Sequence, residues 1–272
     1  IADDLARVRE RFGGGSLGIR RTRIADAPAP VLVDLDAHVE REPITVVLSE
    51  KGWIRAMRGH LADGEGLKFK EGDRLHLLLP CQTTDRLCLL GTQGRAYTLR
   101  AGDLPRGGRG DGQPIRVLVE LGEAGVAALL LWQEDARYLV ASTAGRGFVV
   151  PGAELLAEKR TGKQLFNLKG SDEALVLTLA EGDHVAVVGD NRKMLVFPLE
   201  QVPEMARGGG VILQRFASGG LRDAKVFRLA DGLTWRLGDK VRTETDLRAW
   251  QGDRGAAGRL PPSGFPKSGR FG

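Results

Sequence analysis

One stretch of the sequence decides the fold: residues 86–132, RLCLLGTQGRAYTLRAGDLPRGGRGDGQPIRVLVELGEAGVAALLLW. Along it come an apolar run, a glycine-containing turn, a second apolar run, a loop rich in Gly and Arg, and two more apolar runs, at 87–90, 91–94, 96–99, 104–112, 115–121 and 126–132. Two short apolar runs around a glycine turn are typical of a β-hairpin. The stretch therefore predicts four strands and one basic loop.

The same order of features recurs five times along the chain, with successive turns roughly 40 to 50 residues apart. The hairpin segments are ITVVLSEKGWIRAM, RLCLLGTQGRAYTL, RYLVASTAGRGFVV, HVAVVGDNRKMLVF and the weaker LTWRLGDKVRT, which begin at Ile44, Arg86, Arg137, His184 and Leu233. This period is typical of four-stranded propeller blades, which bury both faces by packing radially against their neighbours. The sequence thus predicts an all-β, five-bladed, propeller-like ring, with two separate β-domains as the alternative.

Composition divides the chain into three expected parts. Residues 1–42 begin with a helical pattern, in which Ile1, Leu5, Val8 and Phe12 share one face, and continue as a linker rich in Ala and Pro. We expect this part to be a helix end and a tether to a preceding region. Residues 43–260 should form the bladed domain, and residues 261–272 a flexible tail.

The charge of the chain favours a partner that carries negative charge. Lys and Arg number 40 against 35 Asp and Glu, a net charge of +5. Two cysteines, Cys81 and Cys88, cannot build a disulfide framework, and no apolar run reaches membrane-spanning length. We therefore expect a cytoplasmic protein with reduced thiols. The cysteine spacing and the scattered histidines also predict no metal site.

Basic residues recur at two positions in the units: the loop after each hairpin, and the hairpin turn with its flanks. Glycines in the loops let backbone amides approach a ligand, and guanidinium groups donate to phosphates. Because equivalent positions of blades share one edge, we expect a track for the phosphates of a DNA duplex. The predicted DNA-binding residues are Arg55, Arg58, Arg95, Arg100, Arg106, Arg109, Arg146, Lys159, Arg160, Lys163, Arg192, Lys193 and Arg207, with Lys51, Arg254 and Arg259 in the same two sets.

Catalytic motifs are missing from the sequence. It contains no Walker, G-x-S-x-G or H-E-x-x-H pattern. The aromatic residues Trp132, Phe148, Phe166 and Trp235 lie in apolar runs, so we expect them in the core rather than stacked on bases.

Two segments carry a family resemblance. Residues 47–55, VLSEKGWIR, resemble the unit that opens the C-terminal domain of type IIA topoisomerase A subunits. RRTRI at 20–24 resembles the segment that joins this domain to the cleavage core. Nearly the whole chain matches the order of repeats in this family. The resemblance implies a β-pinwheel, the propeller variant that this family uses.

A box in the loops separates two branches of the family. Gyrase A subunits carry a sequence similar to Q-[R/K]-R-G-G-[R/K]-G in the first blade's loop, where this chain has RGHLADGEG. The nearest match, PRGGRG at 105–110, lies in the second unit and lacks the leading Gln. The pattern therefore resembles topoisomerase IV A subunits first and gyrase A subunits second, and negative supercoiling by wrapping is not expected.

The resemblance also implies partners and a division of labour. The domain would bind and bend double-stranded DNA without reading bases, and would present the duplex for strand passage, decatenation, relaxation and chromosome segregation near the nucleoid. Neither Tyr97 nor Tyr138 lies in the motif of the catalytic tyrosine, so this part would not cut DNA. No cofactor is expected here; ATP and Mg²⁺ would act in the topoisomerase IV B subunit and in the core of an A2B2 enzyme, whose A subunits dimerise through the core. A gyrase-type wrapping domain and a protein-interaction propeller remain the alternatives.

Overall fold

A computed structural model describes residues 1–14, 40–106, 110–238 and 240–272, and the chain forms two compact units, Ile1–His38 and Val39–Gly272. The first unit contains helix α1, Ala2–Phe12. Acidic residues in its first turn and basic residues in its last turn complement the helix dipole. The expected amphipathic helix is confirmed. None of the described helices is long and apolar enough to cross a lipid bilayer.

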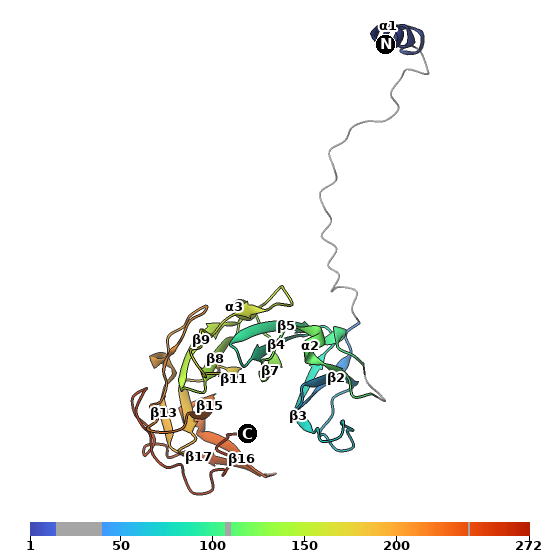
Figure 1. Cartoon of the computed structure of the whole chain (residues 1–272). Helices are drawn as coiled ribbons and strands as arrows, with labels where there is room; N and C mark the ends of the chain where they lie inside the picture. The colour runs from blue at the N-terminus through green and yellow to red at the C-terminus, as the bar shows by residue number, and fades with distance from the viewer. Residues whose placement is uncertain (15–39, 107–109, 239) are drawn as a thin grey trace. The chain divides into compact units, whose positions relative to one another are not determined.

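The second unit holds five antiparallel sheets, here called blades 1 to 5 in chain order, which follow one another around an arc (Figure 1). Strand order is β3-β1-β2-β6 in blade 1, β10-β5-β4-β7 in blade 2, β11-β8-β9-β14 in blade 3, β13-β12-β15 in blade 4 and β16-β17 in blade 5. The strands of blades 1 and 2 are β1 Pro43–Ser49, β2 Trp53–Arg58, β3 Leu75–Gln82, β4 Arg86–Gly91, β5 Arg95–Arg100, β6 Gln113–Pro114, β7 Val126–Leu131 and β10 Lys163–Gln164. Those of blades 3 to 5 are β8 Arg137–Ser142, β9 Arg146–Pro151, β11 Ala174–Leu179, β12 His184–Gly189, β13 Met194–Pro198, β14 Val211–Ile212, β15 Leu221–Phe227, β16 Leu233–Leu237 and β17 Lys240–Glu244. The all-β pinwheel prediction is confirmed.

The fourth strand of each complete blade comes from the next repeat along the chain. β6 pairs with β2, β10 with β5, and β14 with β9. Short helices accompany these strands: α2 Ile115–Leu118, α3 Gly152–Leu155, η2 Ala101–Asp103, η3 Leu199–Gln201 and η4 Leu229–Asp231. Helix α2 corrects the prediction of a strand at 115–121. Ile115 and Val119 are buried at helical spacing after Pro114, and a short apolar run does not distinguish helix from strand.

The core lies between successive blades, because alternate residues of each strand face opposite neighbours. Leu87 and Leu89 of β4 pack with the residues of blade 1, whereas Cys88 and Leu90 pack with those of blade 3. The rings of Phe148 and Phe166 meet edge to face at 5.3 Å between centroids in the core between blades 2 and 3. The expected core positions of Phe148, Phe166 and Trp235 are confirmed, and Trp132 is half-buried.

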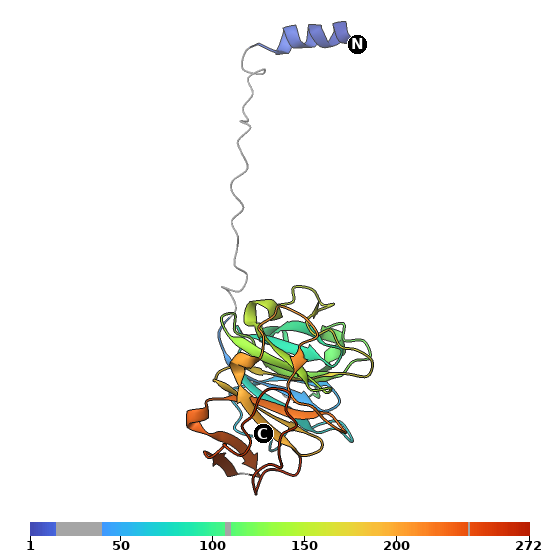
Figure 2. The same cartoon turned by 90° about the vertical axis from the view of Figure 1, so that its left-hand side faces the viewer.

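Blade 5 is a two-stranded hairpin that the C-terminal residues complete. Phe265 and Phe271 are buried, and Trp235 Nε1 donates to the Gly264 carbonyl at 3.0 Å. The Phe271 amide donates to Asp223 Oδ2 at 2.8 Å. Figure 1 places the C-terminus inside the arc, and Figure 2 draws it within the outline of the domain. The expectation of a flexible tail at 261–272 does not agree with this packing. The Gly and Pro content of this segment predicts flexibility, whereas its two phenylalanines, Phe265 and Phe271, are buried in the core.

Candidate nucleic-acid interface

The exchanged strands decide which blade each basic loop touches. The Ala56 amide of β2 donates to the Pro105 carbonyl at 2.9 Å, and Gln113–Pro114 pairs with β2, so the described ends of the PRGGRG loop lie against blade 1. The sequence had assigned this loop to the second unit, and its Arg109 lies outside the described residues. Loops 156–162, 202–210 and 251–259 likewise contact blades 2, 3 and 4. These four loops are thus shifted by one blade from their place in the sequence.

Three of the predicted arginines hold these loops in place. Arg95 donates from Nε to the Thr161 carbonyl at 3.0 Å and from Nη2 to the Gly162 carbonyl at 3.1 Å. Arg146 donates to the Gly209 and Gly210 carbonyls at 2.9 and 2.6 Å. These bonds are charge-assisted and replace water at half-buried carbonyls. Arg95 and Arg146 therefore fasten the loop that enters their blade from the next repeat.

Arg55 serves the same purpose from inside the protein. Its residue is 5 % exposed, and its two Nη atoms donate to the carbonyls of Gly110 and Lys68 at 2.6 and 2.8 Å. The guanidinium also lies over the Phe69 ring, 5.4 Å from the centroid. This buried position does not suit a phosphate contact, so the sequence prediction for Arg55 is wrong. The sequence pattern around Arg55 predicts a strand, but it does not indicate that the side chain donates to the carbonyls of Gly110 and Lys68.

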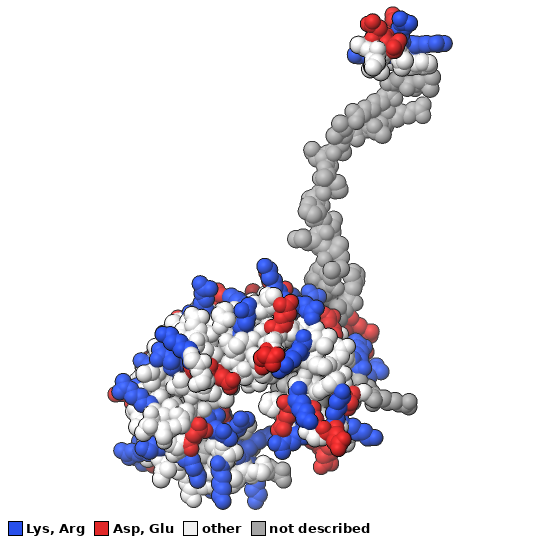
Figure 3. All heavy atoms as spheres, viewed as in Figure 1, with Lys and Arg blue, Asp and Glu red and all other residues white. Residues whose placement is uncertain are grey.

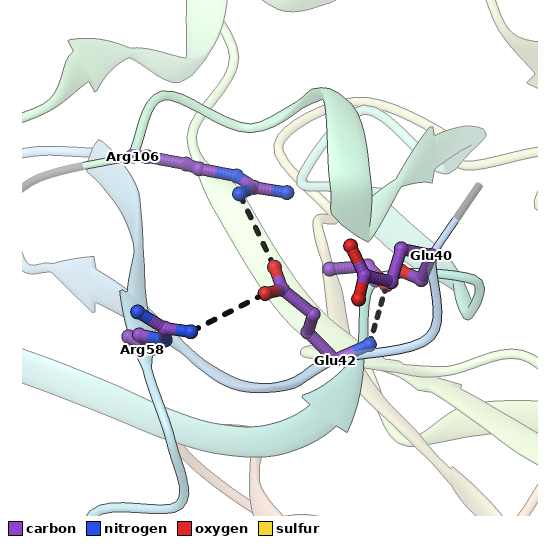
Figure 4. A network of polar contacts seen from close by, with 5 residues as sticks. Glu40, Glu42, Arg58 and Arg106 are labelled. Carbon is purple, nitrogen blue, oxygen red and sulfur yellow. Dashed lines mark hydrogen bonds and ion pairs between the residues drawn. The ribbon is translucent and has the colours of Figure 1, made fainter.

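Other predicted cations have acidic or carbonyl partners at the surface. Arg58 and Arg106 both approach the Glu42 carboxylate (Figure 4), and Lys163 Nζ lies 2.5 Å from Glu154 Oε2. Arg160 donates to the carbonyls at the end of α2. Surface ion pairs of this kind are weak, at about 0–1 kcal/mol, so these side chains can exchange partners.

A further group is exposed and has no ion pair to a described residue. It contains Lys159, Arg192, Lys193 and Arg207. Arg100, at the end of β5, is also exposed. Among the described non-glycine residues, Arg192 alone has a positive φ, 58°. The equivalent turn residues of blades 1 to 3 are Gly52, Gly94 and Gly145, with φ of 80°, 82° and 74°.

Three segments that carry the exposed cations Lys193, Arg215 and Arg259 come together beside β13 of blade 4. The buried Gln214 amide donates to the carbonyls of Lys193 and Ala257 at 3.0 and 2.9 Å. The backbone of Arg259 pairs with Met194 through two hydrogen bonds, of 2.7 and 2.9 Å. We call Arg192, Lys193, Arg215 and Arg259 the blade 4 cluster; all four are exposed. Sequence reasoning missed Arg215, because it follows a two-residue strand that no local pattern marks.

Net charge is uneven along the chain. Residues 181–272 hold 15 Lys and Arg against 11 Asp and Glu, whereas residues 40–180 hold 19 against 18. Figure 3 shows Lys and Arg along the outer contour near β13 and β15–β17, and a mixture with Asp and Glu near β3. The excess of positive charge is therefore larger in residues 181–272 than in residues 40–180.

Chemistry other than anion binding has little support in the described residues. Both cysteines are buried and unpaired, and burial raises the pKa of Cys88 to about 12. The hydroxyls of Tyr97 and Tyr138 donate to backbone carbonyls in the interior. Within the described ranges, no three His, Cys, Asp or Glu side chains are grouped as metal ligands.

Comparisons with known proteins agree with this architecture. The family described as DNA gyrase C-terminal domain, beta-propeller, matches residues 85–120, 137–177 and 183–222. The A subunit of DNA topoisomerase 4 from Rickettsia bellii is 38% identical over 273 residues, which cover 100% of this chain and 37% of the relative. The Caulobacter vibrioides protein of the same name is 42% identical over 92% of this chain and 33% of its own length. The chain thus spans about a third of the length of these relatives.

A solved structure gives the same result for the fold. The E. coli ParC C-terminal domain superposes with a TM-score of 0.68 at 29% identity, over 82% of this chain and 95% of that domain. Sheet order, repeats and sequence similarity along the whole chain agree. The chain belongs to the family of C-terminal β-propeller domains of type IIA topoisomerase A subunits, and within it resembles the topoisomerase IV members.

Proposed function

We propose that residues 39–272 bind double-stranded DNA along the outer edge of the blades, through phosphate contacts that are independent of base sequence. The observation that carries this proposal is the blade 4 cluster. Buried Gln214 and the Met194–Arg259 backbone pairing bring three segments together, and these segments carry four exposed cations with no ion pair to a described residue. Phosphate groups are the ligands that such a surface suits, and the basic loops of blades 1 to 3 would extend the path.

The backbone of Arg192 supports this proposal. A left-handed conformation costs a non-glycine residue roughly 1 kcal/mol, and the other three blades place Gly at this point. Glycine would be the more stable residue in the turn of blade 4 as well. An arginine held there at a cost in stability is consistent with a binding role for its charge.

In the longer protein, this domain would act with parts that the chain does not contain. We propose that it bends the duplex and presents it for ATP-dependent strand passage by a topoisomerase IV, in decatenation, relaxation and chromosome segregation in the cytoplasm. The B subunit and the cleavage core would supply ATP hydrolysis, Mg²⁺ and the catalytic tyrosine. The A subunits would dimerise through that core. This part of the proposal rests on the similarity to topoisomerase 4 A subunits.

A salt titration with variants tests DNA binding. Affinity for a random-sequence duplex, measured by fluorescence anisotropy, should fall on a log–log plot with a slope of about −0.9 per phosphate contacted. The double variant Arg215→Gln/Arg259→Gln should flatten that slope by about 1 to 2, equally for AT-rich and GC-rich duplexes. The double variant Arg74→Gln/Arg248→Gln removes the same charge from two arginines with carboxylate partners, and serves as the control. A wild-type affinity that does not change with salt would refute the proposal.

DNA topology separates the two family branches. Relaxed circles bound by this domain and then treated with a nicking-closing enzyme should show little change in linking number if the duplex is only bent. A large positive change would indicate gyrase-type wrapping. Absence of DNA binding together with specific capture of the B subunit would support the protein-interaction alternative.

A further inference from the structure

Two arginines from different repeats share one carboxylate on blade 1 (Figure 4). Arg58, at the end of β2, places Nη2 3.6 Å from Glu42 Oε1. Arg106, in the loop after η2, places Nη1 3.2 Å from Glu42 Oε2. The arginine side chains are 91 % and 66 % exposed, whereas that of Glu42 is 24 % exposed. The carboxylate is thus the covered member of the group, and the two guanidinium groups face solvent around it.

Backbone hydrogen bonds hold all three residues in position. Glu42 and Thr83 are joined by two bonds of 3.0 Å, from the Glu42 amide to Thr83 Oγ1 and from the Thr83 amide to the Glu42 carbonyl. Thr83 is buried and also donates to the Glu40 carbonyl at 2.5 Å. Arg106 bridges to Ala56 of β2. The segments that carry these residues are therefore already in position before a ligand binds.

We propose that Arg58 and Arg106 form a phosphate site that Glu42 occupies in the free protein, and that one phosphate of bound DNA takes the place of the carboxylate. This rests on the proposed function, and it adds a means of regulating it. Carboxylate and phosphate are both anions that accept paired hydrogen bonds from guanidinium groups. Glu42 therefore competes with DNA for the same two arginines, and lowers affinity at the end of the arc where the chain enters blade 1.

Neutralising the competitor should strengthen DNA binding. An exposed ion pair is worth about 0–1 kcal/mol, so Glu42→Gln should tighten binding about two- to fivefold. The salt dependence should change little, because the same phosphate contacts the two arginines in both proteins. Anisotropy titration of a fluorescent duplex against residues 1–272 measures both quantities.

Glu50→Gln is the matched control. Glu50 also pairs with an arginine, Arg74, at 2.7 Å, but it lies past the opposite end of β1. Glu50→Gln removes the same charge but does not free Arg58 or Arg106. It should therefore alter affinity less than Glu42→Gln does. Equal gains from both variants would show a general charge effect and overturn the phosphate site.

A mutant cycle tests the arginines directly. Removing both of them, with Arg58→Gln/Arg106→Gln, should cost little in the wild-type background and at least twofold more in the Glu42→Gln background. An equal cost in both backgrounds would refute the competition, even if DNA binding itself is strong. Loss of DNA binding in every protein, including wild type, would refute the proposed function instead. Urea midpoints of all variants show that each is folded.

Discussion

The arginine that fastens the loop of blade 3 offers the sharpest test of the structure. Arg146 donates from Nε and Nη2 to the carbonyls of Gly209 and Gly210, just before the exchanged strand β14. Arg146→Gln shortens the side chain and removes both donors. The loop would then lose its fastening to β9, while the strands of blade 3 keep their own pairing.

The size of the effect follows from the two bonds. A hydrogen bond from a charged group contributes about 1.5–3 kcal/mol, and solvent around the half-buried Arg146 reduces this. We therefore expect the free energy of unfolding to fall by about 2–3 kcal/mol for the pair of bonds. With a urea m-value of about 3 kcal/mol/M, the unfolding midpoint should fall by about 0.7–1 M.

Urea denaturation followed by tryptophan fluorescence measures this change, and Arg207→Gln provides the control. Arg207 lies in the same loop, but its exposed side chain has no ion pair to a described residue. It should change the free energy of unfolding by less than about 0.5 kcal/mol. The reasoning fails if Arg146→Gln unfolds at the wild-type midpoint and instead weakens DNA binding, since Arg146 would then be a phosphate ligand.

Further outcomes follow from single positions. Arg192→Gly should raise the free energy of unfolding by up to about 1 kcal/mol and weaken DNA binding; loss of stability in urea would contradict the strained turn. Phe265→Ala should cost about 3 kcal/mol and shift Trp235 fluorescence, because the two rings meet at 5.5 Å; wild-type emission and stability would argue against a packed tail. Cys88 should resist iodoacetamide at pH 8 until urea is added, since burial raises its pKa to about 12; rapid native labelling would contradict that burial. Partial burial pushes the pKa of Asp73 upward, but hydrogen bonds from a serine and two amides outweigh it and lower the pKa below 3.8. Stability that this carboxylate adds at neutral pH should be lost as pH falls from 3.8 through the lowered pKa, and Asp73→Asn should remove that loss; equal acid profiles would refute it.

Local patterns predicted the hairpins correctly, because their information lies within a few residues. β4 and β5 alternate between two neighbouring cores, and Gly94 has the positive φ that the turn between them requires. The same argument placed Phe148 and Phe166 in the core. It failed at 115–121, where a two-residue strand is followed by α2, because so short a strand carries no periodicity.

The sequence by itself determined the repeat, the hairpins, the buried faces and the excess of basic side chains, because each of these is a property of neighbouring residues. Only the tertiary structure decided which arginines remain open to a ligand. Arg55, Arg95 and Arg146 donate to carbonyls 55 to 67 residues away, in loops that cross to the preceding blade. Every residue carries a carbonyl, so no residue type marks such a partner, and the exchange of strands between blades brings it into reach.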